Sequence, residues 1–224
     1  MRLLLSFLLC LCALFSQTGT NHVAIKQANP PDTNPRYFPV GLFSKHPQLS
    51  ESRARWYASE LRDLEEPSLR QGKITTGPVY RLLLIPPFTP SLVVRLTVNS
   101  DGSGKLLAKL GTKRSKDTET TQKQQTLSLS SEQVSKFLSL LREANFWSLP
   151  TEGYEESLMR GADGREWVVE ANKSGNYHVV DRSDGLIEAS FSRACEYLLE
   201  LAPLKAETGH RTRSEINQSV PSPD

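Results

Sequence analysis

Cysteine and net charge are both scarce in this chain. Its 224 residues include three cysteines, and two of them, Cys10 and Cys12, fall in an apolar stretch near the N-terminus. If the mature protein lacks that stretch, Cys195 has no internal disulfide partner, and the fold must be stabilised by a hydrophobic core. The formal net charge of +2 creates no broad positive field. Nucleic acid is therefore not expected as a partner.

The familiar catalytic and metal signatures are also missing after the N-terminal stretch. The sequence has no G-x-S-x-G elbow, no glycine-rich phosphate loop, no H-E-x-x-H and no C-x-x-C. No second histidine or cysteine stands at ligand spacing from His178. The sequence accordingly predicts no cofactor, no metal site and no catalytic residue that can be assigned.

The N-terminus is the most informative segment that is present. Arg2 precedes the apolar run Leu3–Phe15, and polar residues begin at Ser16. This order is typical of a secretory signal peptide, here residues 1–19, and the run is shorter than the roughly 20 apolar residues of a membrane span. We expect cleavage near residues 16–20, export to the periplasm or the medium, and no stable membrane span afterwards. An uncleaved signal anchor is the alternative.

The remaining chain divides by composition. Residues 20–49 are polar and rich in proline, which disfavours helix, and they predict an extended lead-in. Residues 50–204 carry the periodic apolar patterns of a single α+β domain. Residues 205–224 lack periodicity and predict a disordered tail.

Three helices are expected in the domain. The first covers about 51–65, with Ser50 or Ser52 as its cap. The second begins at Ser130, where Ser130 and Gln133 fit a capping box. The last carries apolar residues at helical spacing between residues 187 and 202.

Strand patterns separate these helices. Residues 79–85 form a nearly continuous apolar run, and residues 92–98 and 106–110 alternate around an Asp-Gly turn. A short strand at 126–129 and a second hairpin over 165–182 complete the set. We therefore expect one antiparallel sheet of about five or six strands, packed against two or three helices on one face.

The second hairpin also carries a resemblance. Trp167-Val168-Val169-Glu170 is followed by Gly175-x-Tyr177-His178-Val179-Val180-Asp181-Arg182. Together with Ser130-x-x-Gln133 and Phe146-Trp147-x-Leu149-Pro150, this pattern resembles a family of uncharacterised exported bacterial proteins with no known activity. The resemblance covers roughly residues 79–201. It implies a shared exported α+β domain and no particular reaction.

Alternation sorts the side chains of this hairpin onto two faces. The first face is mostly apolar and should meet the helices; it holds Trp167, Val169, Ala171, His178, Val180 and Arg182. The second face should be wetter; it holds Glu166, Val168, Glu170, Tyr177, Val179 and Asp181. We expect Glu170, Tyr177 and Asp181 to be solvent-side residues or, alternatively, to converge as a binding surface, a hard-cation site or a pair of acid–base carboxylates.

Single residues favour structural roles. His178 lies on the opposite face from Asp181, so the two do not form a catalytic pair, and a hydrogen bond from a partly buried ring is the expected role for His178. Cys195 sits on an apolar helix stripe and should be buried and inert. The three tryptophans should anchor the fold.

Taken together, these features favour an exported non-enzymatic protein that acts as a binding or envelope-associated module. Its candidate binding residues are Glu170, Tyr177, Asp181 and His178, and its envelope or extracellular partner is unknown. The alternative is a hydrolase that uses Glu170 or Asp181. An enzyme would present a concave pocket where these groups meet polar residues from distant segments.

Overall fold

The computed structural model describes residues 36–70, 77–87, 89–111, 123–153 and 164–204. The chain divides into two units, residues 1–33 and 34–224, and every described residue belongs to the second. The predicted signal peptide, the part of the predicted lead-in before residue 36 and the predicted tail from residue 205 therefore lie outside the described residues. Among the described residues, no helix is both long and apolar enough to cross a membrane.

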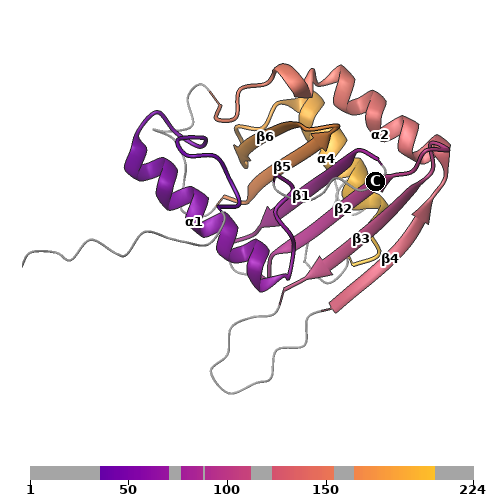
Figure 1. Ribbon diagram of the computed structural model, residues 1–224, viewed down its shortest axis with the longest axis horizontal. Helices are drawn as coiled ribbons and strands as arrows, with labels where there is room; N and C mark the ends of the chain where they lie inside the picture. Colours follow the sequence, from indigo (N-terminus) through magenta and orange to yellow (C-terminus); the bar gives the residue numbers. More distant parts are fainter. Residues whose placement is uncertain (1–35, 71–76, 88, 112–122, 154–163, 205–224) are drawn as a thin grey trace, which may run out of the picture. The chain divides into compact units, whose positions relative to one another are not determined.

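Six strands form one sheet, in the order β4-β3-β2-β1-β5-β6 (Figure 1). All neighbouring pairs are antiparallel, and they include the two predicted hairpins. The strands are β1 (Val79–Ile85), β2 (Leu92–Val98), β3 (Gly104–Leu110), β4 (Lys123–Leu129), β5 (Glu166–Lys173) and β6 (Asn176–Ser183). The predicted α+β class and its single antiparallel sheet are confirmed.

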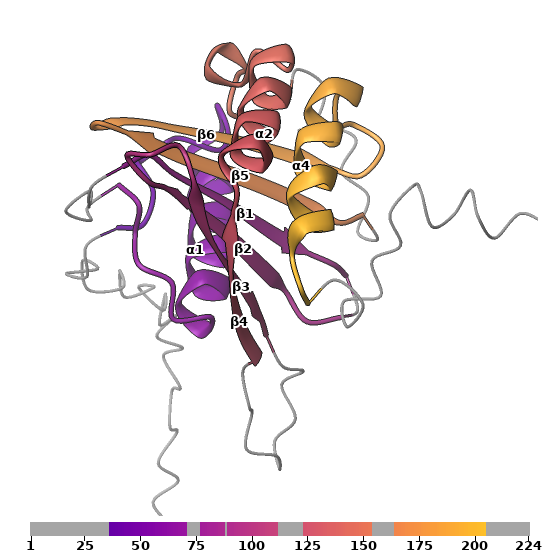
Figure 2. The ribbon, with the colours of Figure 1, turned by 90° about the vertical axis from the view of Figure 1, so that its right-hand side faces the viewer.

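One face of the sheet is covered by α2 (Ser131–Glu143), the short helix η1 (Phe146–Ser148) and α4 (Ala189–Leu201) (Figure 2). The capping box is present: the Ser130 side chain accepts from the Gln133 amide, and the Gln133 side chain accepts from the Ser130 amide. Apolar residues of both helices pack against Leu82, Val94 and other residues of the same sheet face. This layer is the larger hydrophobic core.

The other face is covered by α1 (Pro47–Asp63) and the segment before it. Phe38 and Phe43 of the expected lead-in are buried here with Tyr57 of α1. The expectation that all helices share one face was therefore wrong, and the domain has three layers (Figure 2). Ser50 does not cap α1, because the helix begins earlier, at Pro47, and the Ser50 hydroxyl accepts a hydrogen bond from the Phe43 amide instead.

The extra layer explains the sequence of β1. All seven of its residues are buried, because the strand lies in the middle of the sheet and is covered on both faces. A continuous apolar run is the pattern that such a strand needs. Arg81 interrupts that run and is nevertheless fully buried, so it must find acidic partners inside the protein.

The tryptophans divide between core and surface. Trp167 is buried and donates from its indole nitrogen to Asp184 at 2.8 Å, as expected of an anchor of the fold. Trp56 is 43% exposed and Trp147 is 37% exposed. The anchoring role predicted for all three therefore holds only for Trp167.

Candidate functional site

The polar face predicted for the second hairpin is buried, not wet. Glu170 is 1% exposed and Asp181 is 0% exposed, because α1 and residues 36–46 cover this face. Val168 and Val179 on the same face belong to the apolar core under α1. The expectation of a wetter face was wrong because it assumed helices on one side only.

Glu170 and Tyr177 do come together, as part of a buried ion network. The Tyr177 hydroxyl donates to Glu170 Oε1 at 2.6 Å, and Arg81 Nε donates to Glu170 Oε2 at 2.8 Å. Burial, followed by the Glu170 charge and hydrogen bond, raises the pKa of Tyr177 well above its ordinary value, so its hydroxyl stays a donor. Both carboxylate oxygens of Glu170 are therefore occupied by neighbouring side chains.

The network extends through Glu66, which follows α1 in the chain. Arg81 Nη1 donates to the Pro67 carbonyl at 2.6 Å. Glu66 Oε2 lies 2.9 Å from Arg95 Nε, and Glu66 Oε1 lies 3.1 Å from Lys109 Nζ. Three cations thus surround the two carboxylates of Glu66 and Glu170, leaving one positive charge in excess. The arrangement clamps the end of α1 onto β1, β2, β3 and β5.

Asp181 lies on the same face but in a separate contact. Its carboxylate accepts from the Tyr57 hydroxyl of α1 at 3.1 and 3.3 Å, and its backbone amide donates to the Thr151 carbonyl at 2.8 Å. Asp181 therefore ties β6 both to α1 and to the segment that follows η1. It does not converge with Glu170 and Tyr177.

His178 occupies the opposite face, as alternation predicts. Its ring lies edge-on to Phe146, with centroids 5.0 Å apart, and 5.9 Å from the Trp147 ring. Burial lowers the pKa of His178. Hydrogen bonds with the backbone of Phe146 and Leu149 raise the pKa in part, and the positive charge of Arg182 lowers it further. A neutral, packed imidazole fits the structural role expected from the sequence.

Arg182 links three segments at this end of the sheet. It is fully buried, and its guanidinium binds the Glu188 carboxylate at 2.9 Å and the carbonyls of Pro150 and Thr151 at 3.2 and 3.0 Å. Glu188 is the residue at the N-cap of α4. One side chain therefore fixes β6, the start of α4 and the segment after η1.

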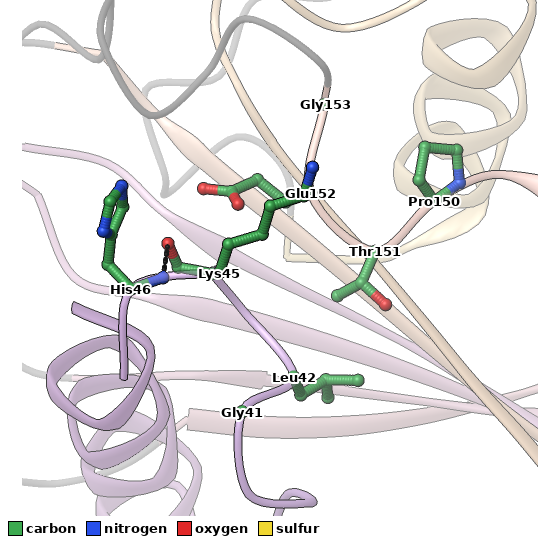
Figure 3. A pocket seen from close by; sticks show the side chains of 9 residues that line it. Gly41, Leu42, Lys45, His46, Pro150, Thr151, Glu152 and Gly153 are labelled. Atoms are coloured by element: carbon green, nitrogen blue, oxygen red, sulfur yellow. Dashed lines mark hydrogen bonds between the residues drawn. The ribbon is translucent and has the colours of Figure 1, made fainter. Parts of the chain in front are cut away.

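A concave feature lies beside that segment. A hollow of about 650 Å³ opens between residues 41–46, ahead of α1, and residues 150–153 (Figure 3). Its walls include Lys45, His46, Thr151 and Glu152, and none of the four predicted binding residues lines it. Its size falls within the range of about 300–1,000 Å³ that is usual for small-molecule sites.

An ion pair joins the two walls of the hollow. Arg53 Nη1 donates to the Phe43 carbonyl at 3.0 Å and to Glu152 Oε1 at 2.7 Å. The Arg53 side chain is 8% exposed, so this contact is well shielded from solvent. Because residues 53 and 152 lie far apart in sequence, no local pattern could have indicated the pairing.

The rim of the hollow is electropositive. Lys45 is exposed, and among the described residues no carboxylate lies within ion-pair distance of its ammonium group. His46 is the N-cap of α1 but makes no capping hydrogen bond through its side chain, and the first turn of α1 contains no acidic residue. The positive end of the helix dipole therefore meets Lys45 at the opening.

Metal binding and cysteine chemistry are two further possibilities for the described residues. Among the described residues, no group of three or more histidine, cysteine or acidic side chains is placed to hold a metal ion. Cys195 is buried, and burial raises the pKa of its thiol far above the ordinary value, which matches the inert role expected for it.

Comparison with known proteins adds no assignment. No protein-family model matches the chain, and no curated protein matches it. The resemblance carried by the second hairpin stays a prediction.

Proposed function

We propose that this chain is an exported, non-enzymatic binding protein whose ligand site is the hollow between residues 41–46 and 150–153. The observation that carries the proposal is the hollow itself, an open concavity whose rim carries Lys45, an exposed lysine with no ion-pair partner among the described residues. The apolar run Leu3–Phe15 supports export. The partner is then a component of the envelope or of the medium.

The burial of the carboxylates favours this function over a hydrolase. Glu170 is enclosed by Arg81 and Tyr177, and Asp181 is enclosed by Tyr57 and fully shielded from solvent. A catalytic carboxylate must come within hydrogen-bond reach of a substrate. Neither group lines the hollow, so the geometry gives the hydrolase alternative no support.

The lining of the hollow favours an anionic ligand with a short apolar part. Lys45 and the start of α1 provide positive potential, and the charge of Glu152 is already compensated by Arg53. Leu42 and Pro150 provide apolar wall between these polar groups. A carboxylate that carries a short alkyl chain matches both features.

Hexanoate is the probe that tests this site, with hexan-1-ol and hexylamine as uncharged and cationic controls. The protein purified after expression of the full gene is titrated with each compound and followed by backbone amide NMR. We expect saturable shifts for hexanoate at Thr151, Glu152 and the first turn of α1, and no saturable shifts for hexylamine.

The matched variants are Lys45→Gln and Lys173→Gln, because Lys173 is an exposed lysine at the end of β5. Lys45→Gln should weaken hexanoate binding about tenfold, as expected for loss of one charge-assisted hydrogen bond. Lys173→Gln should bind like the wild type. Equal affinity in wild type and Lys45→Gln, or shifts confined to other surfaces, would contradict the proposal.

A further inference from the structure

The two edge strands of the sheet, β6 and β4, differ in what covers them. At β6, the Asp181 amide donates to the Thr151 carbonyl, and Glu152 forms a short parallel bridge with Asp181. Arg182 holds this covering segment in place through the Pro150 and Thr151 carbonyls. The β6 edge is therefore occupied by the protein's own chain around Asp181, near the end of the strand.

The β4 edge has no comparable cover among the described residues. All seven residues of β4 pair with β3 in one unbroken register, from Lys123 opposite Leu110 to Leu129 opposite Gly104. In an antiparallel strand, alternate residues direct their amide and carbonyl groups away from the partner strand. In the part of the chain that the structure describes, β4 has no second strand neighbour to receive these groups.

β4 also lacks the features that usually protect an edge. It contains no proline, its register shows no bulge, and its one charged residue is Lys123 at the start of the strand. Six of its seven residues are exposed, and among them the apolar Leu127 is 41% exposed. A regular, nearly uncharged strand of this kind is a template for pairing with another strand.

We propose that β4 pairs with β4 of a second copy of this chain, antiparallel and about a two-fold axis at Thr126. This register places Lys123 of each copy opposite Leu129 of the other, so no like charges face each other. Gln124 lies opposite Ser128, and Gln125 lies opposite Leu127. The two exposed Leu127 side chains then lie diagonally across the axis, within reach of each other.

The second copy is favoured as the occupant because, about this axis, all seven residues of β4 face a residue of the partner strand and the one charge of each strand, Lys123, faces Leu129. The same geometry limits the assembly to two chains through this contact, because a two-fold contact uses the β4 edges of both copies. One strand pair is a small interface compared with the roughly 800 Å² per partner of stable complexes. The dimer is therefore weak and depends on protein concentration.

Sedimentation velocity over a wide concentration range tests the proposal on the protein purified after expression of the full gene. The variants are Thr126→Lys and Thr126→Glu, each of which places two like charges opposite each other at the axis. Ser52→Lys is the control, because it adds a charge to an exposed position of α1, on the layer away from β4.

We expect a reversible wild-type dimer, about tenfold weaker self-association for each Thr126 variant, and wild-type behaviour for Ser52→Lys. An equimolar mixture of Thr126→Lys and Thr126→Glu should recover dimerisation, because opposite charges then meet at the axis. A wild type that stays monomeric overturns the proposal and leaves the edge for an extended segment of another protein. A dimer that is insensitive to both variants also overturns it, since the contact then uses another surface.

Hydrogen exchange of the wild type gives a measurement that needs no variant. Alternate amides of residues 123–129 should become protected as protein concentration rises, while the amides of exposed turns stay unchanged. Protection that does not change with concentration would contradict pairing between copies.

Discussion

Replacing Arg81 by Met isolates the energetic role of the buried ion network. Arg81 is fully buried, and its Nε lies 2.8 Å from Glu170 Oε2, so Arg81→Met leaves the Glu170 carboxylate inside the protein without its principal counter-charge. Breaking a buried pair in this way costs about 3–5 kcal/mol. This is a large part of the roughly 5–15 kcal/mol by which a domain is usually stable.

A double-mutant cycle separates the pair from its surroundings. Arg81→Met, Glu170→Met and the double variant are compared by urea unfolding followed by circular dichroism. We expect the double variant to be more stable than the sum of the single effects predicts, by about 2–3 kcal/mol, because it removes both charges. Arg95→Met is the matched control, and it should cost only about 1 kcal/mol because the Arg95 side chain is 25% exposed.

Additive single effects in this cycle would refute the reasoning, because they would show that Arg81 and Glu170 do not depend on each other for stability. A cost below about 1 kcal/mol for Arg81→Met would do the same. If Arg81→Met does not fold, Glu170→Gln takes its place in the test. Glu170→Gln keeps the shape and removes the charge, and it should destabilise by less than Glu170→Met.

Two further predictions concern His178 and the N-terminus. Burial lowers the pKa of His178, so the unfolded state takes up a proton before the folded state does as the pH falls below about 6.5. The free energy of unfolding should therefore decrease with acidification until the pH reaches the lower pKa of the folded state. His178→Gln should remove this part of the pH dependence in urea titrations between about pH 7 and 5. Parallel slopes for wild type and His178→Gln would contradict that assignment. Mass spectrometry of the protein from fractionated cells should find an N-terminus near residues 16–20 in the exported fraction. An intact Met1 N-terminus in the cytosol would contradict export.

Local signals in the sequence predicted local structure well. The capping box at Ser130 and Gln133 depends on residues three apart, and it is present as expected. The alternation of β5 and β6 correctly sorted His178 and Asp181 onto opposite faces. The start of α1 was misplaced because the cap expected at Ser50 was overridden by a tertiary contact, the hydrogen bond from the Phe43 amide.

The sequence was less informative about which face of the sheet meets water. Both faces of the second hairpin carry valines, and Val168 and Val179 on the face expected to be wet are buried under α1. Arg81 within an apolar run was a second available signal, because a charge in a central strand needs a buried partner. By contrast, the contact of Arg53 with Glu152 depends on the folded path of the whole chain.

The shape of the proposed binding hollow depends on the same contacts that bury Asp181 and keep its carboxylate away from any ligand in the hollow. Tyr57 of α1 binds Asp181, the Asp181 amide binds Thr151, and Arg53 of α1 binds Glu152. One wall of the hollow therefore precedes α1 and is carried by it, and the other is fixed to the edge of β6. Because α1 makes one contact with each wall, we expect a ligand bound in the proposed site to stabilise the seating of α1 on the sheet, and a shift of α1 to change the width of the hollow.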